Sequence, residues 1–277
     1  MNTFQKIIKY VAIGFAIILT VGILSGLVGA VATVVTVFNG IDGEVKTMDF
    51  SEDFTDVEKL DISNKYGKLS IRPGDQFRVE ATDVSDKFRA KVKDGTLIVD
   101  ESDYKFLWFD FGKSINRKAY ITIYVPENFN AKRIEIDSGA GEVILENLST
   151  DALIVNAGVG KIIGWNILAR SVKASGGVGD IKFTDVNFKD VEFDSGVGNI
   201  KLEGIITGDS EFDCGIGSVE IDIKANREDY NLDIDSGVGD IKVNGGKISS
   251  DYKDNYRSDH SISVNGGIGS VEINFRP

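Results

Sequence analysis

Residues 193–198 read FDSGVG, and this phrase decides the fold because variants of it recur throughout the second half of the chain. Each copy has an apolar or small residue, then Asp, Asn or Ser, a small residue, Gly, an aliphatic residue and Gly. The seven copies occupy residues 136–141, 155–160, 174–179, 193–198, 212–217, 234–239 and 264–269. Their final glycines stand 19 residues apart in the first five copies, and the spacing then widens to 22 and 30. A regular period of this kind is typical of stacked repeats.

Each copy predicts a β-strand that ends in a sharp corner. Alternate positions from Ile134 to Ala140 are expected to share the inward face of a strand. After Gly141 the apolar positions continue with the opposite parity, as at Val143, which indicates a bend in the chain. The residue before the first glycine is always small, so we expect it to point inward at the corner. Cys214 occupies this position in one copy and is therefore expected to be a buried, inert thiol.

These observations predict an all-β fold, a β-solenoid of roughly 19-residue coils that spans residues 134–277. Residues 39–133 contain further strand patterns without the glycine phrase, and we expect them to form a β-rich N-terminal cap region. Residues 66–71, YGKLSI, are a candidate for a degenerate first coil. A cap is expected because the end strand of a solenoid is an open edge that favours aggregation.

The N-terminus predicts a membrane anchor. No charged residue lies between Lys9 and Asp42, and residues 11–38 are long enough for one transmembrane helix. The alternative is a cleaved signal peptide, with residues 30–32, AVA, as its cleavage site; the apolar run is too long to favour it. Lysines before the span and acidic residues after it place a short tail, residues 1–10, in the cytoplasm. The expected location is the plasma membrane, single-pass, with the bulk of the chain extracytoplasmic.

The predicted span also carries a small-residue motif. Gly22, Gly26 and Ala30 lie four residues apart, a pattern that allows two helices to pack closely. A homo-oligomer formed through the transmembrane helix is therefore one expectation. The other is that these residues reflect only the usual glycine and alanine content of membrane helices.

Charge and residue content argue against several classes of function. The net charge of −12 makes nucleic acid and anionic lipid surfaces unfavourable partners. The Gly-x-Gly phrases are followed by strands and not by helices, so they do not predict nucleotide binding, and no cofactor is expected. The single histidine, His260, has no catalytic constellation around it in the sequence, so an enzyme is only a remote alternative.

A column of polar residues is the best candidate for a metal site, although we expect no metal. One member comes from each copy of the phrase: Asp137, Asn156, Ser175, Asp194, Asp213, Asp235 and Asn265. Calcium prefers several carboxylate oxygens, whereas Asp and Asn also cap turns through their own side chains. The order of the copies predicts that Asp194, Asp213 and Asp235 lie on consecutive coils. We expect turn capping without an ion.

Two segments are candidate interaction surfaces. The first is an aromatic cluster between two predicted strands, which includes Phe106, Trp108 and Phe109; it either caps the solenoid or contacts lipid or a partner. The second is the extra chain before the last copy, with Tyr252, Tyr256 and Arg257. Insertions in repeat proteins often lie on the binding face, and the alternative is a tolerated surface loop.

The repeats resemble the bacterial toastrack family, also called the "putative adhesin" family, a group of unknown function. The resemblance rests on residues 66–71, on the strand ITIYVP at 121–126 and on the Gly-x-Gly phrases. It implies a non-enzymatic cell-envelope protein that presents its solenoid to an unknown envelope or surface partner. The alternative that it implies is a partner of another membrane protein in envelope-stress signalling.

Overall fold

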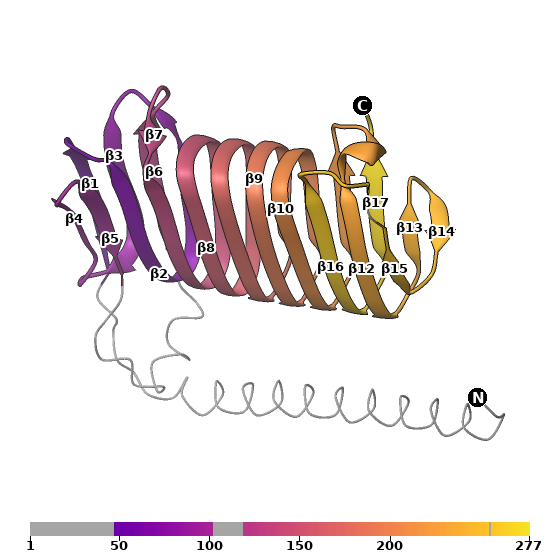
Figure 1. Cartoon of the computed structure of the whole chain (residues 1–277). Helices are drawn as coiled ribbons and strands as arrows, with labels where there is room; N and C mark the ends of the chain where they lie inside the picture. Colours follow the sequence, from indigo (N-terminus) through magenta and orange to yellow (C-terminus); the bar gives the residue numbers. More distant parts are fainter. Residues whose placement is uncertain (1–46, 102–118, 255) are drawn as a thin grey trace, which may run out of the picture. The chain divides into compact units, whose positions relative to one another are not determined.

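A computed structural model describes residues 47–101, 119–254 and 256–277 of the chain. These residues form an all-β stack with a single 3-10 turn, η2 (Arg227–Asp229) (Figure 1). The strands are β1 (Thr47–Phe54), β2 (Lys59–Gly74), β3 (Phe77–Ser85), β4 (Arg89–Lys93), β5 (Thr96–Asp100), β6 (Tyr120–Pro126), β7 (Asn130–Ala131), β8 (Arg133–Val178), β9 (Ile181–Val197), β10 (Ile200–Ile216), β11 (Val219–Ile223), β12 (Asn231–Val238), β13 (Ile241–Val243), β14 (Gly246–Ile248), β15 (Asp251–Lys253), β16 (Ser261–Ile268) and β17 (Val271–Phe275).

The described part of the chain contains no helix that is long and apolar enough to cross a membrane. The predicted span at 11–38, with Gly22, Gly26 and Ala30, lies outside the described residues. So do Phe106, Trp108 and Phe109 of the aromatic cluster.

The predicted coils are present and lie parallel to one another, and the central coils are offset by 19 residues. β8 and β9 pair along three runs in each coil, so that residues 162–165, 168–169 and 172–178 lie beside 181–184, 187–188 and 191–197. β10 continues the same ladder beside β9. Each coil therefore has two longer sides joined at the glycine corner and one short side, and the β-solenoid prediction is confirmed for these residues.

Close stacking explains the glycine corner. Gly179 has a φ of +138°, a conformation that residues with a side chain rarely adopt. A Cβ atom there would lie 1.5 Å from the carbonyl oxygen of Gly160 in the preceding coil. The final glycine of the phrase is thus required both by its own backbone angles and by the approach of the neighbouring coil.

A second corner is formed by polar residues in the left-handed conformation. Asn147, Asn166 and Asp185 have φ values of 51°, 53° and 52°, and they also follow the 19-residue period. Asn and Asp tolerate this conformation better than other residues with a side chain. The side-chain amide of Asn166 donates to the side-chain oxygen of Asn147 at 2.5 Å, which links neighbouring coils at this corner.

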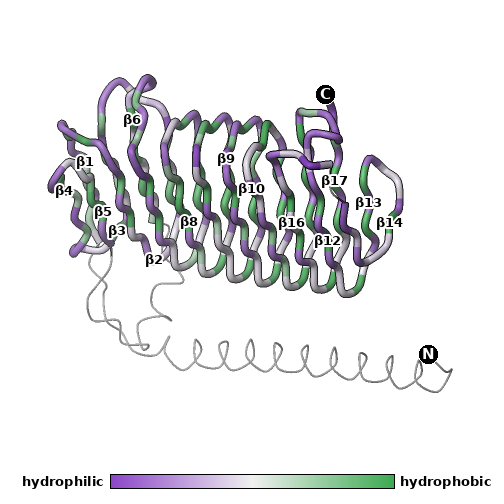
Figure 2. Tube along the Cα trace, in the orientation of Figure 1, coloured by the Kyte–Doolittle hydropathy of each residue, from purple (hydrophilic) through white to green (hydrophobic). Residues whose placement is uncertain are grey.

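The interior is a single apolar column. Val191 and Phe193 point inward on one side of the glycine corner, and Ile200 and Leu202 point inward on the other. This change of parity is the bend that the sequence indicated. Phe183, Phe188, Phe193 and Phe212 stack through the centre, with ring centroids 5.3–5.6 Å apart. Figure 2 shows the resulting alternation of hydrophobic and hydrophilic residues along the strands.

The N-terminal end is closed by strands that precede the repeats. β2 lies beside β8 with Gly67 opposite Gly141, so residues 66–71 do form part of a coil. β5 and β6 pair with the other edge of β2. β1, β3 and β4 then add in antiparallel orientation and cover the stack.

At the C-terminal end, the order of the coils in space differs from their order in the sequence. The last strands of the chain are inserted between earlier ones, because β16 pairs with both β10 and β12, and β17 pairs with both β11 and β13 (Figure 1). The coil that contains Gly239 is therefore outermost. It is covered by β15 on one side and by β14 on the other, both antiparallel.

This insertion explains the widened spacings. In the 22-residue step the chain passes by way of η2 from β11 to β12, which lies two levels further along the stack. The level between them is occupied by β16 and β17. The 30-residue step contains β14 and β15, which cover the end of the stack. The chain then turns back and forms β16 and β17 in the level between. The extra chain is thus an end cap, and not a loop that the stack merely tolerates.

Candidate functional site

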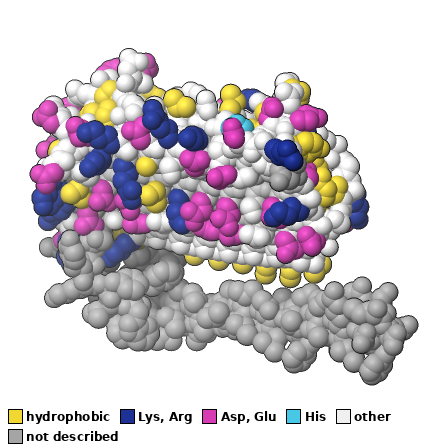
Figure 3. Space-filling model, viewed as in Figure 1, with side chains coloured by type: hydrophobic (Ala, Val, Ile, Leu, Met, Phe, Trp, Pro, Cys, Tyr) yellow, Lys and Arg dark blue, Asp and Glu magenta, His cyan; other side chains and the backbone are white. Residues whose placement is uncertain are grey.

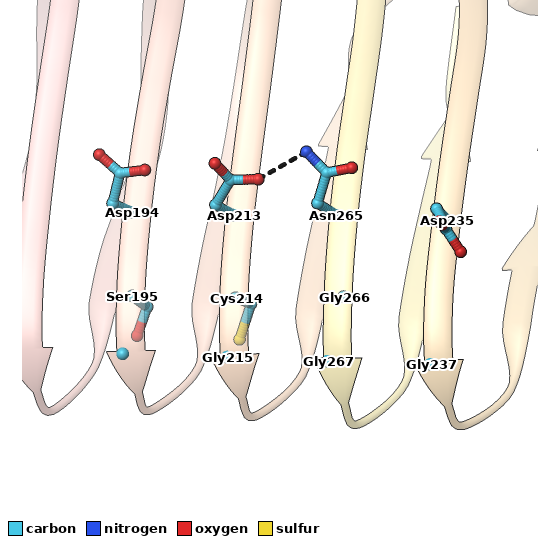
Figure 4. Close-up of a pocket in the computed structure, with 11 residues that line it drawn as sticks. Asp194, Ser195, Asp213, Cys214, Gly215, Asp235, Gly237, Asn265, Gly266 and Gly267 are labelled. Atoms are coloured by element: carbon cyan, nitrogen blue, oxygen red, sulfur yellow. Dashed lines mark hydrogen bonds between the residues drawn. The ribbon is translucent and has the colours of Figure 1, made fainter.

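The polar column runs across the strands on one side of the glycine corner. Asp213 lies opposite Asp194 on one neighbouring strand and opposite Asn265 on the other. Asp235 lies on the far side of Asn265 (Figure 4). The prediction that Asp194, Asp213 and Asp235 lie on consecutive coils is therefore wrong, because the inserted β16 places a neutral amide between the last two carboxylates.

Hydrogen bonds run along the column from coil to coil. The amide of Asn265 donates to the carboxylate of Asp213 at 2.7 Å, and Asn156 donates to Asp137 at 2.8 Å. The hydroxyl of Ser175 lies 3.3 Å from Asp194. Turn capping within each phrase was expected, but these bonds join neighbouring coils instead. Among the described residues, no group of three or more His, Cys, Asp or Glu side chains is arranged to hold a metal ion.

The column borders a shallow, open groove at the corner. Its lining includes the carboxylates of Asp194, Asp213 and Asp235 and the exposed backbone of the glycines that follow them (Figure 4). A groove with bare backbone and several carboxylates can accept hydrogen-bond donors and cationic groups from a partner. It has no apolar enclosure of the kind that a small-molecule site requires.

Asp61 on β2 lies opposite Glu135 on β8. It belongs to a cluster of carboxylates beside the N-terminal end of the polar column. Partial burial raises the pKa of the Asp61 carboxyl, and the neighbouring carboxylates of Glu135, Asp137 and Asp100 raise it further. The folded chain therefore takes up a proton at Asp61 more readily than the unfolded chain does.

Cys214 occupies the small inward position, as predicted. It is 3 % exposed, and its thiol lies 3.4 Å from the carbonyl oxygen of Gly198. Burial raises the pKa of the thiol, which favours the unreactive protonated form. Cys214 is therefore a packing residue, although it borders the groove.

Tyr252, Tyr256 and Arg257, the second candidate interaction surface, lie at the C-terminal cap. Tyr252 packs against the core, and its hydroxyl donates to Asp254 at 2.9 Å; this hydrogen bond is the main cause of its raised pKa. Arg227 pairs with Asp254 and lies 4.9 Å over the exposed ring of Tyr256. Arg257 is exposed, with a φ of 58°. The cap thus uses Tyr252 for packing and leaves Tyr256 and Arg257 at the surface.

A row of exposed aliphatic side chains lies at the tip of the glycine corner. We name it the aliphatic ridge, and in spatial order it consists of Ala140, Val159, Val178, Val197, Ile216, Ile268 and Val238. Apart from the partly buried Ala140, its members are 37–54 % exposed. Hydrophobic side chains form a row along the lower edge of the stack in Figure 3. The expectation that Ala140 shares the inward face is therefore wrong, because the chain turns one residue before the alternation would reach it.

The aliphatic ridge and the second corner both had signals in the sequence. Every copy of the phrase has Ala, Val or Ile between its two glycines, and Asn147, Asn166 and Asp185 recur every 19 residues. The first signal was missed because simple alternation assigns that position to the core. The second was missed because the left-handed preference of Asn and Asp was not combined with the period.

One family of known proteins matches most of the chain. The model of the family described as "Toastrack DUF4097" matches residues 57–274. No curated protein matches the chain. A crystal structure of a "putative cell adhesion protein" from Clostridium sporogenes is 18 % identical, with a TM-score of 0.47, and covers 83 % of this chain and 100 % of its own.

Two further solved structures are similar. A "putative adhesin" from Bacteroides fragilis is 14 % identical, with a TM-score of 0.39, and covers 85 % of this chain and 100 % of its own. A "Putative lipid binding protein" from Parabacteroides distasonis is 16 % identical, with a TM-score of 0.43, and covers 83 % of this chain and 98 % of its own.

Proposed function

Because the chain belongs to the Toastrack DUF4097 family, we propose that it is a non-enzymatic, membrane-anchored protein of the cell envelope that presents its solenoid for binding. The anchor is the apolar stretch at 11–38, with the N-terminus in the cytoplasm. The partner is a protein or surface molecule outside the cytoplasm.

The observation that carries this proposal is the repetition of one surface feature on every coil. Asp194, Asp213 and Asn265 stand side by side on parallel strands, above the bare glycine backbone of the groove. Neighbouring strands are about 4.8 Å apart, so the column offers a partner several equivalent hydrogen-bonding groups in a line. Such a line suits an extended polypeptide or another repetitive polymer, as in other solenoids with long binding surfaces.

Photo-crosslinking in intact cells tests the proposal. A photoreactive residue is introduced at Asp213 in the groove, and separately at Leu168, which is more exposed than Asp213 but lies beside the second corner. We expect a partner to be captured from the Asp213 position and not from Leu168. Equal capture from both positions, or capture from neither, would contradict binding at the column.

The identity of the captured partner separates the two candidate roles. A molecule from another cell or from the cell surface supports the adhesin role. Another membrane protein of the same cell supports envelope-stress signalling instead, because the predicted tail at 1–10 is too short for a signalling domain of its own.

A further inference from the structure

We infer that the aliphatic ridge rests against the surface of a lipid bilayer, so that the stack lies along the membrane with its glycine corner towards the lipid. This inference builds on the proposed membrane anchor. It adds which edge of the stack faces the membrane and which residues make the contact.

The fold does not by itself require aliphatic side chains on the ridge. The flanking glycines are fixed by stacking, since a Cβ atom on Gly177 would lie 2.5 Å from the carbonyl oxygen of Gly158. Val178, by contrast, points outward and is 49 % exposed. Threonine has nearly the same shape as valine and suits a β-strand equally well. Nevertheless, all seven members are Ala, Val or Ile, which produces a continuous apolar strip with no charged residue adjacent to it in the sequence.

The aromatic segment of the chain is joined to the stack at this same edge. The amide of Glu101 donates to the carbonyl of Ser63, and the amide of Lys68 donates to the carbonyl of Ala119. These contacts flank Gly67, which lies opposite Gly141 at the glycine corner. The connection between residues 101 and 119, whose sequence includes FLWFDF at 106–111, thus leaves and re-enters the stack beside the N-terminal end of the ridge.

The N-terminal apolar stretch is joined at this edge as well. Tyr120 at the corner pairs with Thr82, and β3 continues beyond it to Ser85, which pairs with Thr47. Eight residues, 39–46, connect Thr47 to the proposed anchor. Eight residues span at most about 28 Å, so an anchor at 11–38 keeps this end of the glycine corner close to the bilayer.

A bilayer fits the ridge better than a second copy of the chain does. The ridge is one side chain wide between glycines, whereas a stable protein interface buries about 800 Å² on each partner. Two facing ridges would also bring together the acidic columns that run beside them, for example through Asp194 and Asp213. A lipid surface requires neither a matching shape nor a countercharge.

The charges beside the ridge define the type of lipid. On one side of the ridge, Asp194 lies three residues before Val197, which corresponds to about 10 Å along a strand. On the other side the charges are nearer, because Glu142, Lys161, Asp180 and Asp240 each lie two residues after a ridge member. Carboxylates outnumber the lysine on this side, and their separation from the ridge is comparable to the screening length of about 8 Å at physiological salt, so they repel an anionic lipid surface mainly at low salt. Zwitterionic lipid is therefore the favoured surface, and anionic lipid weakens the contact at low salt.

Fluorescence quenching in the full chain tests the inference. In a Cys214→Ser background, Val178→Cys and Leu168→Cys are each labelled with an environment-sensitive dye, because these side chains are 49 % and 53 % exposed on different edges of the stack. The chain is reconstituted into phosphatidylcholine vesicles that contain headgroup-quencher lipid. We expect at least about twofold stronger quenching at 178 than at 168, and less of it when anionic lipid is added at low salt. Thermal melts confirm that both labelled variants fold.

Equal quenching at the two positions would overturn the ridge contact, as would disulfide crosslinking of Val178→Cys between two chains without lipid quenching. Retention of the chain in the vesicles after an alkaline wash is measured in parallel. Loss of the chain in that wash contradicts the proposed anchor. Retention with equal quenching contradicts the ridge contact alone.

Discussion

The side-chain amide of Asn265 donates a 2.7 Å hydrogen bond to the carboxylate of Asp213, although the two residues are 52 positions apart in the sequence. This bond exists because β16 lies between β10 and β12. It also separates Asp213 from Asp235, so the longest run of adjacent carboxylates in this part of the column is Asp194 with Asp213. A neutral amide thus reduces the electrostatic repulsion at the point where three aspartates would otherwise be adjacent.

We predict that calcium has no effect on the stability of the natural chain. Its melting temperature should be the same in chelator and in millimolar calcium, because no three carboxylates among the described residues are arranged to hold a metal ion. Asn265→Asp should lower the melting temperature by a few degrees, since each new pair of carboxylates at this spacing costs about 1 kcal/mol. A rise of more than about 5 °C with calcium in the unaltered chain would contradict this prediction.

The glycine corner predicts that one added methyl group is strongly destabilising. Gly179→Ala should cost about 3 kcal/mol or more, because it combines a φ of +138° with a Cβ that lies 1.5 Å from the carbonyl oxygen of Gly160. Gly245→Ala is the matched control. It also has a positive φ, 75°, but no atom lies within 4 Å of its Cβ, so it should cost only about 1 kcal/mol. If denaturant melts show that the two variants lose the same free energy of unfolding, the backbone angle alone, and not coil stacking, requires glycine.

Cys214 should tolerate small residues and reject large ones. Cys214→Ala and Cys214→Ser should melt close to the natural chain, because other coils have Ala157 and Ser195 at this position. Cys214→Leu should lose about 1–3 kcal/mol through overpacking at the corner. If thermal melts of the Leu and Ala variants coincide, the inward position has more room than its 3 % exposure indicates.

Two aspartates should have opposite effects on the pH dependence of stability. Asp61 has a raised pKa in the folded chain, so its folded form binds protons more readily than the unfolded form, and stability falls as pH rises through that pKa. Asp61→Asn should therefore raise the melting temperature at pH 7 by about 1–2 °C, and the gain should vanish near pH 3.

Asp53 is the matched control for Asp61. The hydrogen bonds from Arg78, at 2.5 and 3.0 Å, lower the pKa of Asp53. Its contribution to stability is present above the ordinary aspartate pKa and is lost as pH falls through the lowered value. Asp53→Asn should therefore lower the melting temperature at pH 7. A decrease for Asp61→Asn, or an increase for Asp53→Asn, would contradict these assignments.

The inserted coil predicts that the chain tolerates loss of a central coil better than loss of its end. Removing residues 261–277 deletes β16 and β17 and leaves β10, β11, β12 and β13 each with one unpaired edge, so the chain should aggregate or lose its cooperative melt. Deleting residues 181–199 removes one period and rejoins equivalent positions, so the stack should remain folded and shorter. Size-exclusion chromatography and thermal melts distinguish the two outcomes. A monomeric, cooperatively folded truncation would contradict the insertion.

Local sequence patterns predicted the parts of the fold that depend on local geometry. The 19-residue spacing, the small inward residue at Cys214 and the parity change after Gly141 all follow from steric requirements within one coil and its neighbour. The order of the coils in space does not follow from these requirements. β16 presents the same pattern of inward and outward residues to β10 as β12 would, so local patterns cannot distinguish the two neighbours. The spacings of 22 and 30 were the only trace of the insertion. The inward position predicted for Ala140 was wrong for a similar reason, because the alternation of residues does not reveal where a strand ends.

The inserted coil also affects the order in which the stack can form. In the central coils each new strand closes a loop of about 19 residues, whereas the contact of Asp213 with Asn265 closes one of 52. The longer loop adds about 0.9 kcal/mol of closure entropy. Central coils can therefore form one after another as the chain emerges, but the level between β10 and β12 stays open until β16 and β17 have been made. Two strands that lie far along the chain thus complete the stack.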